Sequence, residues 1–249
     1  MEQKVQEQAI YETNRSLDVL KYLLPHVTNR RMYTVGIKGE CRDTAGSSLV
    51  VDLETGNSLE YGNDRPWKWR IEPKHSKVMV DIGVSALSEI LKKQNCTELE
   101  EAILQALHWY GMAQDQADEK NSLLCLITCF ETFFTRDDRD KTITNTLSEA
   151  IALMFSDGLE SRKKTIKEVK DVYTLRGKFS HGRRGKKRQG KLEEEVANYV
   201  SELTELANAL LQKMIWLRDR FTDLDQLHNW LDEAKLRGNL WQCDEGPML

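Results

Sequence analysis

An arginine and a histidine five positions apart, Arg176 and His181, are the residues of this sequence best suited to chemistry on a phosphodiester. Cleaving RNA without a metal requires a base for the ribose 2′-hydroxyl, an acid for the leaving oxygen and a cation for the charged phosphorane. A histidine can serve in the first two roles and an arginine in the third. Because one chain supplies one such histidine, this chemistry predicts two chains that face each other and pool their histidines.

The spacing of the pair carries little weight by itself, because Arg70 and His75 repeat it. That second copy spans Pro73 in a segment expected to form strand and turn, so no helix would hold it, and we discount it. Arg176 instead falls near the middle of the apolar arc of a helix predicted over residues 165–180. The apolar residues of this arc are Ile166, Val169, Val172, Tyr173, Leu175 and Phe179.

An arginine within an apolar arc needs a partner, since an unpaired buried cation is costly. We therefore expect a carboxylate or an anionic ligand beside Arg176. Glu131 is the candidate carboxylate, because it lies within the apolar arc of another predicted helix rather than opposite it. That arc holds Leu123, Ile127, Phe130 and Phe134.

His181 is followed by Gly182, a residue type favoured just past a helix end, so the imidazole is expected in or beyond the last helical turn. The helix dipole at that end favours the protonated imidazole. Five positions along a helix turn by about 140°, so Arg176 and His181 reach a common target only if the chain leaves the helix near His181. The alternative is structural, with the arginine bridging two helices and the histidine capping one.

The segment around the pair is strongly basic, although the formal net charge of the 249-residue chain is only −4. Residues 176–191 include no acid, and acids crowd the segments on either side. Such a run would hold a phosphate backbone through contacts that weaken with salt. Lys178 could touch the substrate or simply be solvated surface. The other cations expected to bind RNA are Arg183, Arg184, Lys186, Lys187 and Arg188.

The front of the chain is predicted to mix helix and strand. A first helix over residues 10–24 is expected to end at Pro25, because proline disfavours helix in the residue before it. Residues 32–71 are typical of short strands separated by turns. Residues 77–81 could add one more strand before a helix over residues 84–91.

The remainder of the chain has almost wholly helical apolar spacing. We therefore predict a mainly α fold, with a helical bundle over residues 96–249 preceded by a small strand-rich α+β region over residues 1–95. The front region could sense a trigger or restrain the helical domain. The helices expected in the bundle lie near residues 99–110, 123–134, 143–154, 165–180, 192–220 and 224–236.

Composition favours a cytoplasmic protein without a membrane segment, cofactor or metal. No stretch approaches the roughly eighteen apolar residues needed to cross a bilayer, and the polar start does not resemble a secretion signal. The five cysteines include no C-x-x-C pair, and Cys125 and Cys129 are better explained as buried small hydrophobes than as metal ligands. Asp137, Asp138 and Asp140 lie in a polar connector typical of a solvated loop.

Together, Glu131 on one helix, Tyr173 and Arg176 to His181 with Gly182 on a later one, and further helices behind them resemble the HEPN superfamily, in particular its Apea-like branch. The resemblance covers roughly residues 102–235. It implies a helical domain that dimerises and a composite, metal-independent ribonuclease site formed by the motif arginine and histidine. Glu131, Tyr173 and Gly182 would support that site.

The same resemblance implies a class of function, since many HEPN proteins are bacterial toxins or antiviral defence effectors. It favours an endoribonuclease acting on single-stranded RNA or tRNA, with a possible antitoxin or regulatory protein as partner. Gly177 stands where active members often have a polar residue. Because the motif also survives in HEPN proteins that act as binding modules, the alternative is a non-catalytic module that binds RNA, a nucleotide or a partner protein.

Overall fold

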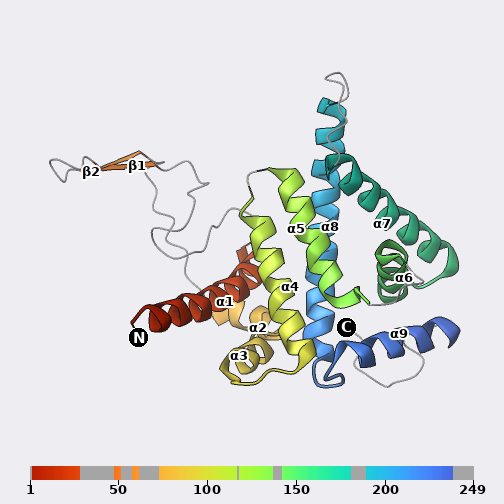
Figure 1. Ribbon diagram of the computed structural model, residues 1–249, viewed down its shortest axis with the longest axis horizontal. Helices are drawn as coiled ribbons and strands as arrows, with labels where there is room; N and C mark the ends of the chain where they lie inside the picture. The colour runs from red at the N-terminus through yellow and green to blue at the C-terminus, as the bar shows by residue number, and fades with distance from the viewer. Residues whose placement is uncertain are drawn as a thin grey trace.

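The computed structural model describes residues 2–28, 48–51, 58–61, 73–116, 118–136, 142–180 and 189–237, and these are mainly helical (Figure 1). The helices are α1 (Glu2–Thr28), α2 (Pro73–Asp81), α3 (Val84–Lys92), α4 (Glu98–Gln114), α5 (Glu119–Phe134), α6 (Ile143–Phe155), α7 (Leu159–Ser180), α8 (Gln189–Leu217) and α9 (Leu224–Arg237). The strands are β1 (Ser48–Val51) and β2 (Ser58–Tyr61). The predicted mainly α fold is therefore confirmed for the described residues.

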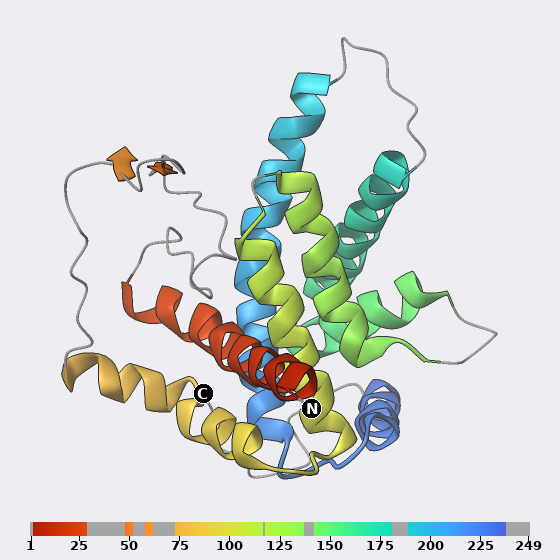
Figure 2. The same ribbon diagram turned by 60° about the vertical axis from the view of Figure 1, so that its left-hand side comes forward.

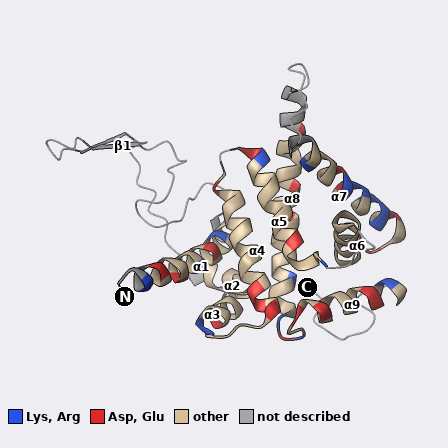
Figure 3. Ribbon diagram, in the orientation of Figure 1, with Lys and Arg blue, Asp and Glu red and all other residues tan. Residues whose placement is uncertain are grey.

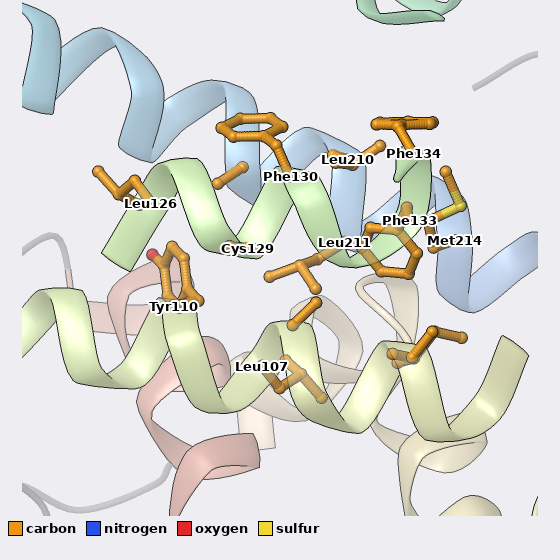
Figure 4. Close-up of a cluster of buried hydrophobic side chains, with 14 of the residues drawn as sticks. Leu107, Tyr110, Leu126, Cys129, Phe130, Phe133, Phe134, Leu210, Leu211 and Met214 are labelled. Atoms are coloured by element: carbon orange, nitrogen blue, oxygen red, sulfur yellow. The ribbon is translucent and has the colours of Figure 1, made fainter. Parts of the chain in front are cut away.

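Helices α4, α5 and α8 lie side by side at the centre of the molecule (Figures 1 and 2). Leu107 of α4, Phe133 of α5 and Leu211 of α8 are completely buried where these helices meet (Figure 4). Burial of each such side chain contributes about 1.5–3 kcal/mol relative to leaving it exposed. The three helices therefore form the rigid support against which the others pack.

Helices α6 and α7 form a second layer that packs along one side of this centre. Their connection is held by a hydrogen bond of 2.9 Å between the Ser156 and Thr165 hydroxyls. Lys213 of α8 donates from Nζ to the carbonyl oxygen of Met154 at 2.6 Å and so satisfies one of the last carbonyls of α6. This layer presents the C-terminal half of α7 to α5.

Helices α1 and α3 complete the same hydrophobic core from the opposite side. Tyr22 of α1 and Leu87 of α3 are fully buried in the cluster that includes Leu107. The turn between α2 and α3 depends on Gly83, whose φ of 101° lies in the left-handed region. A Cβ there would also stand 2.7 Å from Cγ2 of Ile215, so only glycine fits without a shift of α8.

Two local predictions were wrong. The first helix does not end at Pro25, because α1 continues to Thr28 with the proline inside its last turns. Burial of Tyr22 and Leu23 just before the proline anchors these turns, and tertiary packing of this kind outweighs local propensity.

Residues 77–81 are not a strand but part of helix α2. Met79 and Ile82, three positions apart, are buried, while Val78 and Val80 are 38% and 49% exposed, as expected for a helix. The alternation of residue types over 77–81 had suggested a strand instead. Pro73 is the first residue of α2, a position where proline is favoured. Our reason for discounting His75, the lack of a helix, therefore fails, although Arg70 lies outside the described residues.

A strand-rich front region is not shown. Strands β1 and β2 pair antiparallel, with Ser48 opposite Tyr61 and Val51 opposite Ser58. The other segments predicted as strands, 32–41 and 67–72, lie outside the described residues. The boundary at residue 95 stays a prediction. None of the described helices is both long and apolar enough to cross a membrane.

Candidate functional site

The side chains of Glu131, Tyr173 and Arg176 meet where α7 passes α5. Oε1 of Glu131 accepts a hydrogen bond from the Tyr173 hydroxyl at 2.8 Å and another from Nη1 of Arg176 at 2.5 Å. The ion pair predicted between Glu131 and Arg176 is thus present in the structure. One carboxylate oxygen holds two groups of α7 at once.

The burial of this triad is uneven. The Glu131 side chain is 16% exposed and the Arg176 side chain 38% exposed, so the arginine is partly open to solvent while its carboxylate partner is mostly covered. Arg176 Cζ lies 5.7 Å from the centroid of the Tyr173 ring, within the range of a cation–π contact. The ring and the carboxylate together fix the direction in which the arginine points.

Burial, followed by the negative charge of Glu131, raises the pKa of the Tyr173 phenol well above its usual range. The phenol therefore stays neutral at physiological pH and acts as a hydrogen-bond donor to Glu131. Through this hydrogen bond the phenol holds the carboxylate in place.

Local sequence explains why these groups meet. Tyr173 and Arg176 are three positions apart on α7 and so share a face, and Val172 and Leu175 beside them are buried. Glu131 lies in the last turn of α5, which ends at Phe134. A carboxylate is disfavoured at the negative end of a helix dipole, and the Arg176 cation offsets this cost.

The remaining site residues predicted from the sequence are not placed by the structure. Lys178 belongs to α7, but its side chain lies outside the described residues. The same holds for every residue of the segment between α7 and α8, which begins at His181. The members of that segment predicted to act in the site are His181, Gly182, Arg183, Arg184, Lys186, Lys187 and Arg188.

Gly177, the residue after the arginine, lies inside α7 and is partly exposed. A Cβ at this position would meet no heavy atom within 4 Å. The glycine therefore leaves an open patch on the helix surface beside Arg176.

A second charged cluster, between α1 and α4, was missed by the sequence analysis. Nδ1 of His108 lies 2.9 Å from Oδ2 of Asp18, and Lys21 bridges Asp18 at 3.6 Å and Asp115 at 2.7 Å. The hydrogen bond to Asp18 raises the pKa of His108. No sequence spacing could have indicated the pair, because its members are 90 positions apart.

The two cysteines of α5 are in the environments expected of small hydrophobes. Cys129 is fully buried in the core and Cys125 is partly buried, and burial raises the pKa of both thiols. Within the ranges that the structure describes, no three His, Cys, Asp or Glu side chains gather closely enough to hold a metal ion.

No protein-family model, curated protein or solved structure matches the chain. The geometry of the site offers an oriented, partly exposed arginine one helical turn before the end of α7. Such a group is suited to bind an anionic oxygen, and a planar guanidinium can form two parallel hydrogen bonds with a phosphate.

Proposed function

We propose that this protein is a HEPN-type, metal-independent endoribonuclease that acts on single-stranded RNA or tRNA. The observation that carries the proposal is the shared carboxylate, through which Glu131 holds Tyr173 and Arg176 at the C-terminal end of α7. A guanidinium held in this way is preorganised for developing negative charge, which is where electrostatic catalysis acts. His181, the next residue after Ser180 in the sequence, is the proposed acid or base.

The reaction requires no group that the chain lacks. A base removes the proton of the ribose 2′-hydroxyl as that oxygen attacks the phosphorus, and an acid donates a proton to the 5′-oxygen as the phosphorus–oxygen bond breaks. The products are a 2′,3′-cyclic phosphate and a 5′-hydroxyl. His181 of one chain would act as base, His181 of a second chain as acid, and Arg176 would stabilise the charged phosphorane.

The proposed enzyme is a cytoplasmic homodimer that works as a bacterial toxin or antiviral defence effector. Two copies are needed because each contributes one histidine. The basic run from Arg183 to Arg188 would hold the RNA backbone, and an antitoxin or the front region of the chain, residues 1–95, would restrain the activity.

The direct test is to incubate the purified full chain with total RNA in the presence of a chelator. We expect cleavage with 2′,3′-cyclic phosphate ends, and its loss in His181→Ala and Arg176→Ala, with the circular dichroism spectrum retained. His75→Ala, which alters the other arginine–histidine spacing, is the matched control and should cleave normally. RNA binding without cleavage would instead favour the non-catalytic module.

Expression in bacteria gives a second readout. The intact protein should slow growth, and Arg176→Ala or His181→Ala should relieve the effect. Equal toxicity of the variants at equal protein levels would contradict the nuclease assignment.

A further inference from the structure

The outer face of α7 carries an unusual row of lysines. Lys163, Lys167 and Lys170 are spaced by four and three positions, so they fall within an arc of about 60° on one side of the helix. All three are exposed. The row spans two turns, about 10 Å along the axis, so it presents a positive charge at almost every turn.

These charges are little compensated by neighbouring acids. Lys167 and Lys170 form no ion pair with the residues that the structure describes. Lys163 contacts Glu160 at 2.7 Å, but the two side chains are 61% and 84% exposed, and such pairs are weak in water. The row is therefore available to an external anion.

Two of the three acids of α7, Glu168 and Asp171, border the lysine row on one side. Asp171 and Glu168 act on Tyr199 of α8, whose pKa is raised first by burial and then by these carboxylates and two of α8. Glu168 and Asp171 therefore lie within electrostatic reach of α8. Figure 3 shows the basic residues gathered along the middle of α7.

An open patch connects this row to the candidate site. Gly177 is seven positions after Lys170 and four after Tyr173, so it lies between the lysine face and the face that carries Arg176. Apart from its chain neighbours and the nearby backbone of α7, no heavy atom lies within 4 Å of the place where its Cβ would be. Since a helix is about 10 Å across with its side chains, a flexible strand can cross α7 here within a few nucleotides.

We propose that single-stranded RNA runs along the outer face of α7, with its phosphates on Lys163, Lys167 and Lys170, and crosses the helix over Gly177 to reach Arg176. This proposal rests on the proposed function, because it assumes that RNA is the substrate. A polyanion is the partner that fits a charge repeated along a straight line. Leu159, four positions before Lys163, is the one large apolar side chain that α7 exposes among its described residues, and it is too little for the apolar face that membrane binding needs.

The test compares two triple variants of the full chain, each of which removes three exposed lysines. The first is Lys163→Gln/Lys167→Gln/Lys170→Gln. The control removes Lys4, Lys77 and Lys92 from α1, α2 and α3 in the same way. Binding to a labelled single-stranded 2′-O-methyl oligonucleotide, which cannot be cleaved because its nucleophile is blocked, is measured by fluorescence anisotropy from about 50 to about 200 mM salt.

Three phosphate contacts on a single strand contribute about 2 to the slope of log affinity against log salt concentration. We expect the first variant to lose this part of the slope. Its loss of affinity relative to wild type should then be about 20-fold larger at about 50 mM salt than at about 200 mM salt. The control should keep the slope. Cleavage at subsaturating RNA should fall in the first variant together with its affinity, whereas the control should cleave as wild type.

The crossing is tested separately at Gly177. Gly177→Leu should fold, since the space is open, but it should weaken binding about tenfold or more, whereas Gly177→Ala should bind nearly as wild type. Equal binding by the leucine variant overturns the crossing.

The remaining outcomes separate this proposal from the nuclease assignment. Identical slopes for the first variant and the control, with wild-type cleavage intact, overturn the lysine path alone. If the first variant loses part of the salt slope but the wild-type chain cleaves no RNA, the lysine path is supported and the nuclease assignment is refuted. A wild-type chain that binds no RNA overturns both.

Discussion

Removal of the Glu131 carboxylate is the perturbation whose effect the structure predicts most sharply. In Glu131→Ala the Tyr173 hydroxyl loses its acceptor in a largely buried environment, and Arg176 loses its ion-pair partner. A hydrogen bond to a charged group contributes about 1.5–3 kcal/mol, and a surface ion pair at most about 1 kcal/mol.

The magnitude follows from the exposure of each partner. The Arg176 side chain is 38% exposed, so its coupling to Glu131 should be nearer the surface value, about 1 kcal/mol. The partly buried phenol, hydrogen-bonded to a charged group, should contribute about 1.5–2 kcal/mol. We therefore expect Glu131→Ala to lower the free energy of unfolding by about 2–3 kcal/mol, and Tyr173→Phe by about 1.5 kcal/mol.

The assay is urea unfolding at pH 7, followed by circular dichroism and by tryptophan fluorescence so that coincidence of the two curves can be checked. A double-mutant cycle of Glu131→Ala and Arg176→Ala isolates the coupling energy of the pair. Glu160→Ala, which removes an exposed acid of α7, is the control and should change stability by less than about 0.5 kcal/mol.

A coupling energy below about 0.3 kcal/mol, the limit for independent sites, would refute the reasoning. It would mean that the carboxylate does not hold the arginine, and the preorganisation on which the proposed function depends would be lost. The coupling should also weaken in high salt, since the arginine reaches solvent.

Three further predictions concern other parts of the fold. Gly177→Ala should raise the unfolding midpoint by the equivalent of about 0.5–1 kcal/mol, because alanine favours helix and its Cβ meets no neighbour; a lower midpoint would show that the patch is not open. The pKa of His108 is raised, so its bond to Asp18 stabilises the fold fully below the unfolded pKa of about 6.5 and loses this effect as the pH rises through the folded pKa. Because the His108 side chain is half-exposed, wild type should be more stable than His108→Gln by less than about 1 kcal/mol. Urea unfolding should show this difference shrinking between about pH 5.5 and about pH 8.5. A difference that does not change with pH would argue against the ion pair. Leu107→Ala should cost about 2–5 kcal/mol in chemical unfolding because the side chain is fully buried between α4 and its neighbours; a cost below about 1 kcal/mol would place it outside the core.

One part of the candidate site could be predicted from the sequence, namely the charged residues that stand among apolar ones in a predicted helix. A glutamate and an arginine each stood within the apolar arc of a predicted helix, and burial forces such groups to find partners. That requirement made Glu131 a candidate partner for Arg176, and the structure shows their contact.

The lysine row of α7 could not be recognised from the sequence, because its exposure and its few ion pairs depend on the helices that pack around α7. The sequence of α7 mixes lysines with acids, and only the structure shows that Lys167 and Lys170 form no ion pair with the described residues. Charge on a helix has meaning as a surface only after its neighbours are placed.

The helical class and most helices of the bundle follow from the amino-acid pattern alone, because an apolar residue every three or four positions is a local property of the chain. Long-range packing set the elements in which local signals were weak or contradictory. Packing of Tyr22 and Leu23 carries α1 past Pro25, and burial of Met79 and Ile82 selects helix for α2. The pairing of Asp18 with His108 also belongs to tertiary structure, since a contact across 90 positions depends on how α1 packs on α4 and leaves no periodic trace in the chain.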